Sequence, residues 1–256
     1  MIIDTHSHLY DDSLNSDISE VIERAKQEGV QIHLLPNIDV ESIAKMKNLH
    51  KNYPSQTKMM MGLHPCYIKE NYLEELEKIK SDLFQHKEDY IAVGEIGLDF
   101  YWDKTFIDEQ ISCFTEQMKW AMELNLPIAI HSRDSIDKLI SILKVEKKIP
   151  NGVFHCFTGS YEQAAEILKL GYYLGIGGVI TYKNSNLPET IKKIGLERVI
   201  LETDSPFLPP VPYRGKRNEP SYLRQVVKKL SEIFNKSEEE IEEITSNNAK
   251  TLFKIN

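Results

Sequence analysis

The chain has 256 residues, of which 41% are hydrophobic and 27% charged, and its formal net charge is −8 at pH 7. These values suit a soluble globular protein with a full core, and they count against binding nucleic acid over the whole surface. They exclude neither a local basic strip nor a site where bound cations supply positive charge.

The sequence gives no sign of a membrane or secreted protein. No apolar run approaches the roughly 20 residues that cross a bilayer, and no leader-like segment precedes the apolar run that begins at Ile2. Cys66, Cys113 and Cys156 are odd in number and lack a CxxC spacing, which favours reduced thiols. We therefore expect a cytoplasmic protein without membrane contact.

Short apolar segments typical of β-strands alternate with helical patterns along most of the chain. The predicted strands cover residues 2–5, 31–36, 58–63, 90–93, 127–130, 152–154, 172–176 and 199–201. The named helical patterns cover about 17–29, 73–83, 107–124, 136–143, 164–171, 220–234 and 237–253. This alternation predicts a (β/α)8 barrel, with a doubly wound open sheet as the alternative.

Other patterns refine this architecture. No internal repeat or linker divides the chain, so residues 1–256 are predicted to form one domain. No GxGxxG or Walker A pattern follows a strand, so no nucleotide cofactor is expected. Asp17-x-x-Glu20 and Ser237-x-x-Glu240 both match the capping box that starts a helix. The second opens the last of two C-terminal helices, which we expect to be additional to the barrel.

Histidines and carboxylates follow the predicted strands at the end where a barrel carries its active site. In chain order they are His6, His8, His64, Glu95, Asp99, His131, His155, Glu202 and Asp204. On a strand, residues two apart point the same way, so His6 and His8 can converge on one point, although surface exposure is the alternative for an isolated His-x-His. Together these residues predict a binuclear hydrolytic metal site.

Two of the carboxylates suit particular roles. Glu95 follows a glycine and can bridge two cations, which lie about 3.5–4 Å apart in two-metal sites. Asp204 can hold one cation and also accept a proton from the attacking water, as the catalytic base. Asp99 and Glu202 are expected to brace the neighbouring ligands.

Seven segments stand out in chain order: residues 4–8 (DTHSH), 62–65 (GLHP), 94–99 (GEIGLD), 130–133 (IHSR), 155–159 (HCFTG), 202–206 (ETDSP) and 212–220 (PYRGKRNEP). Together they resemble the TatD family of metal-dependent hydrolases. Each motif is weak alone, but the ordered set is specific and covers most of the chain, with no departure at a ligand position.

The resemblance implies an amidohydrolase-type barrel with two divalent cations, such as Mg, Mn or Zn. One cation would be held by His6, His8, Glu95 and Asp204, and the other by Glu95, His131 and His155. Members of the family are typically described as metal-dependent deoxyribonucleases.

Basic residues near the predicted site fit a phosphodiester substrate. Arg133 lies two residues beyond a ligand, and Arg214, Lys216 and Arg217 lie on a proline-rich loop after the eighth strand. Each could contact a phosphate, while anchoring of the loop is the alternative for the last three. His64 is expected either to contact substrate or to support the ligands.

Aromatic and further histidine residues are less informative. Tyr101 and Trp102 could stack on a nucleic-acid base, with rim packing as the alternative. His33, His50 and His86 belong to no motif and are expected to be ordinary surface or core residues.

Three hypotheses follow. The first is a divalent-metal-dependent deoxyribonuclease that acts on DNA from an end. The second is a deacylase or esterase for another substrate, such as aminoacyl-tRNA. The third is a non-catalytic metal-binding adaptor, which is disfavoured because no ligand or candidate base has been replaced.

Overall fold

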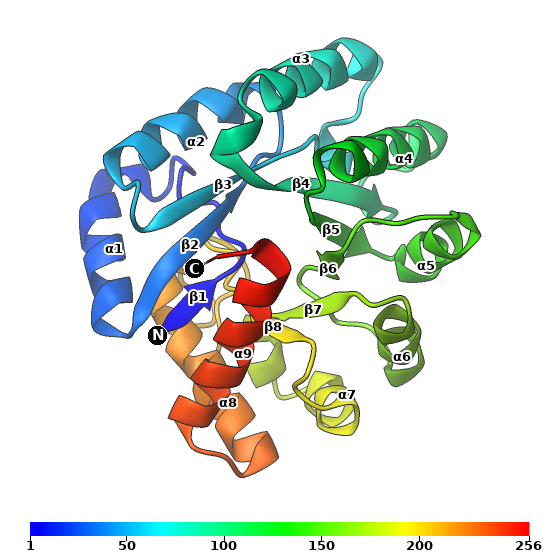
Figure 1. Cartoon of the computed structure of the whole chain (residues 1–256). Coiled ribbons are helices and arrows are strands. Elements are labelled where there is room, and N and C mark those ends of the chain that lie inside the picture. Colours follow the sequence, from blue (N-terminus) through cyan, green and yellow to red (C-terminus); the bar gives the residue numbers. More distant parts are fainter. Residues whose placement is uncertain (256) are drawn as a thin grey trace.

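The computed structural model describes residues 1–255 and contains a sheet of eight parallel strands. Helices surround this sheet (Figure 1). The strands are β1 (Ile2–Asp4), β2 (Val30–Pro36), β3 (Thr57–Met61), β4 (Tyr90–Asp99), β5 (Ile128–Arg133), β6 (Gly152–Phe154), β7 (Tyr173–Ile176) and β8 (Val199–Leu201). They are neighbours in chain order. Thr5 N–H donates to the Leu201 carbonyl, and Ser7 bridges Ser205, so β1 meets β8 and the barrel is nearly closed. The predicted barrel is confirmed.

Helices cover the outside and one end of this barrel. They are α1 (Ile18–Gln27), α2 (Val40–Asn52), α3 (Tyr72–Gln85), α4 (Ile107–Leu124), α5 (Ile136–Val145), α6 (Tyr161–Lys169), α7 (Leu187–Ile194), α8 (Leu223–Phe234) and α9 (Glu238–Phe253). The helical patterns named from the sequence omit α2 and α7. None of these helices, in the described part of the chain, is long and apolar enough to span a bilayer.

The interior of the barrel is filled by one apolar side chain from each strand. These residues are Ile3, Leu34, Met60, Ala92, Ala129, Val153, Tyr173 and Ile200. Leu252 and Phe253 of α9 join the same cluster, and α9 also contacts the start of the chain, where Glu242 lies 3.0 Å from the Met1 amine. Helix α9 therefore covers the end at which the strands begin, and the opposite end is not covered by this helix (Figure 1).

Helix α8 lies between α7 and α1 on the outside of the barrel (Figure 1). It therefore takes the place of the eighth outer helix that a (β/α)8 barrel requires. Of the two helices that follow β8, only α9 is additional to the barrel.

The two predicted capping boxes have different outcomes. Ser237 begins α9 as expected, because its hydroxyl accepts the Glu240 N–H at 3.1 Å and the Glu240 carboxylate accepts the Ser237 N–H at 2.9 Å. The prediction for α1 was wrong, since Asp17 makes no capping hydrogen bond. Its carboxylate instead binds Arg217 at 2.7 Å and Arg24 at 3.3 Å, and these charged partners outcompete backbone amides.

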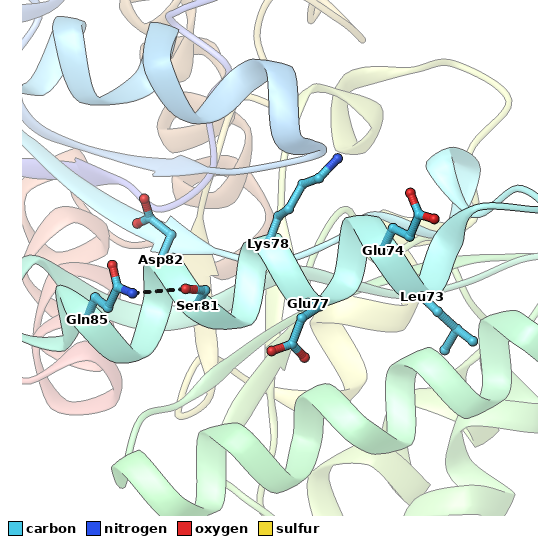
Figure 2. A pocket seen from close by; sticks show the side chains of 7 residues that line it. All are labelled: Leu73, Glu74, Glu77, Lys78, Ser81, Asp82 and Gln85. Carbon is cyan, nitrogen blue, oxygen red and sulfur yellow. Dashed lines mark hydrogen bonds between the residues drawn. The ribbon is translucent and has the colours of Figure 1, made fainter.

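A shallow hollow of about 760 Å³ runs along the outer face of α3 (Figure 2). Its lining comes from α3 alone and consists of Leu73, Glu74, Glu77, Lys78, Ser81, Asp82 and Gln85. None of the residues predicted to bind metal or substrate lines it, so it is separate from the predicted site.

His33 on β2 is buried without compensation. It is 1% exposed, and among residues 1–255 its Nδ1 has no hydrogen-bond partner. Burial lowers the pKa of His33 to about 4. The unfolded chain therefore binds a proton at this residue below about pH 6.5, while the folded chain stays neutral until near pH 4.

His33→Leu should remove one source of acid sensitivity. Between about pH 8 and pH 5 the folded parent should lose about 2 kcal/mol of stability at this residue, and the variant should not. Urea unfolding at both pH values measures this difference. His86→Gln, at an exposed histidine, is the control, and an equal loss in parent and His33→Leu would contradict the assignment.

Candidate metal centre

The ends of five strands bring the six predicted ligands together. His6 and His8 follow β1, His155 follows β6, and Asp204 follows β8. Strand β4 is six residues longer than predicted, so Glu95 lies within it. His131 lies within β5, which is likewise longer than predicted at this end. All five strands end at the open side of the barrel, opposite α9.

The Glu95 carboxylate is the centre of this group. Its Oε2 lies 3.0 Å from His6 Nε2 and 3.6 Å from His8 Nε2. Its Oε1 lies 2.9 Å from His131 Nδ1 and 2.9 Å from His155 Nε2. The two oxygens thus divide the histidines into the same two groups that the resemblance assigns to two cations.

Asp204 belongs to the first of these groups. Its Oδ1 lies 3.4 Å from His8 Nε2 and 3.9 Å from His6 Nε2. The Asp204 N–H donates to the His6 carbonyl at 2.9 Å. The adjoining Thr203 donates both its N–H and its hydroxyl to the buried Asp4 carboxylate, at 2.9 and 2.6 Å. These bonds tie the end of β8 to the end of β1 and so fix Asp204 beside His6 and His8.

The residues present fit a divalent cation. Ring nitrogens of His6 and His8 and an oxygen of Glu95 all lie within 4.8 Å of one another, and all three residues are buried. Imidazole nitrogens and carboxylate oxygens are the donors that Zn, Mn and related cations accept. A cation among these atoms would be bound by the lone pairs of the ring nitrogens and the carboxylate oxygen.

The electrostatic balance of the group also favours cation binding. Burial alone would raise the pKa of Glu95, but the surrounding histidines, His64, His155 and His6, hold it well below its usual range. Burial and the neighbouring His155 lower the pKa of His6, whose ring stacks on that of His155 at 3.8 Å. The centre is therefore built around an ionised carboxylate, with neutral imidazole available at His6.

Two outer carboxylates contact two of the predicted ligand histidines at the ring nitrogen that points away from Glu95. Asp99 Oδ2 lies 2.9 Å from His131 Nε2, and Glu202 Oε1 lies 3.2 Å from His155 Nδ1. A carboxylate accepts the N–H at that position and leaves the opposite nitrogen with its lone pair. This placement is the bracing role expected for Asp99 and Glu202.

Tyr10 does the same for His8 and was missed in the sequence. Its hydroxyl donates to the Pro36 carbonyl at 2.5 Å, so it accepts from His8 Nδ1, 3.1 Å away. The lone pair of His8 Nε2 then faces Asp204. Tyr10 lies two residues after His8, and this spacing was the available signal.

The predicted substrate contacts are placed less uniformly. His64 Nε2 lies 3.3 Å from Glu95 Oε1, within the centre. The Arg133 guanidinium lies over the rings of Tyr101 and Trp102, 4.2 and 5.7 Å from their centroids. These residues are exposed and belong to the loops and strand ends on the open side of the barrel.

The loop after β8 separates its basic residues. Arg214 is exposed and lies over the Tyr182 ring, 3.9 Å from its centroid, and Lys216 lies 5.9 Å from the Tyr213 centroid. Arg217 is held by the Asp17 carboxylate and the Ser13 carbonyl. The phosphate contact considered for Arg217 is therefore replaced by the alternative, anchoring of the loop.

The chain is similar to known metal-dependent hydrolases. A family model described as TatD related DNase matches residues 3–254. The uncharacterized metal-dependent hydrolase YabD of Bacillus subtilis (strain 168) is 43% identical over 258 residues, with 100% of each chain covered.

Solved structures show the same fold. The crystal structure of YjjV, a TatD homolog from Escherichia coli K12, matches with a TM-score of 0.92 at 34% identity, covering 100% of this chain and 98% of that one. An uncharacterized amidohydrolase from Saccharomyces cerevisiae matches in fold with a TM-score of 0.83 at 20% identity, covering 98% and 99%. With its barrel, its histidine and carboxylate centre and these relatives, the chain belongs to the TatD family of metal-dependent hydrolases.

Proposed function

We propose that this hydrolase is a deoxyribonuclease that cleaves phosphodiester bonds from an end of DNA. The observation that carries the proposal is the pairing of the Glu95 centre with cationic groups that can hold phosphates. Arg133 and Arg214 lie exposed on the open side of the barrel, each stacked on tyrosine. Stacking leaves the edge of a guanidinium free to bind phosphate.

Exposed aromatic rings in the loops that follow the strands support a nucleic-acid substrate. They are Tyr67, Tyr101, Trp102 and Phe207, with exposed fractions between 42% and 69%. The Phe207 ring lies 6.1 Å from that of His8, beside the centre. Bases stack on such rings with little sequence preference, whereas a small ester would not need them.

The residues of the centre have distinct tasks in hydrolysis. Two divalent cations, when bound, supply Lewis acidity at the phosphoryl group and acidify a water molecule. The Asp204 side chain is 15% exposed, so it can meet that water and take its proton. Burial would raise the pKa of Asp204, but the neighbouring histidines, His8 and His155, lower it, so the carboxylate is ionised and able to accept a proton.

The experiment that tests the function uses protein reconstituted with a divalent cation. End-labelled single- and double-stranded DNA are the substrates, and aminoacyl-tRNA and a phosphomonoester are the comparison substrates. Progressive shortening from one end supports the proposal. Release of the amino acid without DNA cleavage would establish the deacylase instead.

Asp204→Asn should lower kcat on DNA by about 10²–10⁴, the usual cost of losing a general base. Asparagine keeps one oxygen near His8 but cannot take the proton. Turnover and elemental analysis of the same sample measure this effect. The variant should still bind metal, although more weakly. Asp89→Asn is the control, because Asp89 is exposed and lies directly before β4. If Asp204→Asn turned over DNA at the parent rate, Asp204 would not be the base.

Glu95→Gln should instead reduce the content of both cations. A neutral glutamine should weaken the binding of both cations at once, because each histidine group faces one of the two Glu95 oxygens. Titration with metal, followed by elemental analysis after dialysis, should show that excess cation is needed for occupancy. Retention of both cations at parent affinity would show that Glu95 does not bridge them.

Arg133→Gln and Arg214→Gln should weaken DNA binding and reduce its dependence on salt. Each lost phosphate contact should lower the slope of log KM against log salt concentration by about one. Arg198→Gln is a matched control, because Arg198 also lies over a tyrosine, Tyr173, but before β8 at the closed end. An unchanged slope in both test variants would exclude these arginines as phosphate contacts.

A further inference from the structure

His64 differs from His8, His131 and His155 in the position of its proton. His8, His131 and His155 each contact an acceptor with the nitrogen that points away from the centre, so the nitrogen facing Glu95 or Asp204 carries a lone pair. His64 has the reverse arrangement. Its Nδ1 accepts the Cys66 N–H at 3.0 Å, and an amide can only donate.

The proton of neutral His64 therefore lies on Nε2, the nitrogen that faces the centre. Local structure enforces this tautomer, since His64 precedes the short helix Pro65–Tyr67 and caps it with its ring. Nε2–H points at Glu95 Oε1, 3.3 Å away. Although His64, Glu95 and His131 are close enough to share a cation, His64 could coordinate through Nε2 only after losing that proton too.

The location of His64 suggests what its N–H meets during the reaction. Asp204, which takes the proton of the attacking water, lies on the Oε2 side of Glu95 beside His8. His64 lies on the Oε1 side, beside His131, with ring centroids 4.3 Å apart. In phosphoryl transfer the attacking and leaving oxygens lie roughly in line on opposite sides of phosphorus. The group opposite the base is therefore placed near the leaving oxygen.

We propose that His64 is a catalytic residue that donates its Nε2–H hydrogen bond to the leaving oxygen, and is not a metal ligand. The choice of acceptor rests on the proposed phosphodiesterase function, whereas the position of the proton does not. A new P–O bond forms to the water oxygen, and the bond to the deoxyribose oxygen breaks with its electron pair. Asp204 takes one water proton and releases it to solvent, the departing oxygen is protonated by solvent water, and His64 keeps its own proton.

The dependence on leaving group tests this role. A thymidine dinucleotide releases an alkoxide that needs a hydrogen-bond donor, whereas the 3′- and 5′-(p-nitrophenyl phosphate) esters of thymidine release a stable phenolate. His64→Phe removes the donor and should lower kcat on the dinucleotide by about 10²–10³, against less than about tenfold on the aryl esters. His64→Gln, whose amide can place N–H near the same point, should recover part of the dinucleotide rate.

His86→Gln should leave both rates unchanged and serves as the control. Equal losses on the two substrate types in His64→Phe would overturn the leaving-oxygen role. A parent protein that cleaves neither type would refute this role together with the proposed phosphodiesterase function.

Two measurements without turnover test the position of the proton. In metal-loaded protein with ¹⁵N-labelled histidine, the His64 ring should give the spectrum of the Nε2–H tautomer. His64→Phe should retain as many cations per chain as the parent by elemental analysis. An Nδ1–H spectrum, or the loss of one cation from His64→Phe, would make His64 a ligand and overturn the inference even if DNA is cleaved.

Discussion

The burial of the Glu95 carboxylate is the constraint on which the rest of the centre depends. Removing an ionised carboxylate from water costs several kcal/mol unless opposite charge or hydrogen bonds compensate. Glu95 is 2% exposed; His64 points its Nε2–H at one oxygen, and the other imidazoles direct ring nitrogens at both oxygens, where bound cations would supply the compensating charge. Those imidazoles must in turn be held at their far nitrogens, which explains why Asp99, Glu202 and Tyr10 surround them.

The two ends of the barrel have different roles, since one end contains apolar packing and the other contains the polar residues of the centre. The inner apolar cluster and α9 close the end where the strands begin, so the polar ends of the strands are free to face one another. A second constraint acts on the loop after β8, which is held to α1 by Arg24 with Glu219 and by Arg217 with Asp17. These ion pairs hold the end of the loop that contains Arg217 and Glu219, while Arg214 stays exposed.

The existence of all eight strands could be predicted because each is a short apolar run with polar residues at its end. The length of β4 could not, since polar Glu95 and Asp99 look like a loop until their partners across the barrel are known. The same limit applies to Asp17 and Ser237, which share one local pattern. Ser237 meets only its own helix, whereas Asp17 meets Arg217 from a segment 200 residues away.

The omitted helix α2 shows a different limit, because its N-cap Asp39 forms a capping box with Ser42 in place of glutamate. For the centre, residue types at strand ends were enough to name the group that meets around Glu95. They could not reveal which ring nitrogen of His64 carries the proton, because this depends on one backbone amide in the following turn.

The bonds between the ends of β1 and β8 also set an order of events during synthesis. Asp4 and Thr203 are separated by 199 residues, so the ribosome completes most of the chain before this pair can form. Domains assemble as their segments emerge, at roughly 5–20 residues per second. His6 and His8 therefore wait for about ten seconds or more, on that rate, before Asp204 can join them. A nascent chain therefore cannot bring His6, His8 and Asp204 together before the eighth strand has been made.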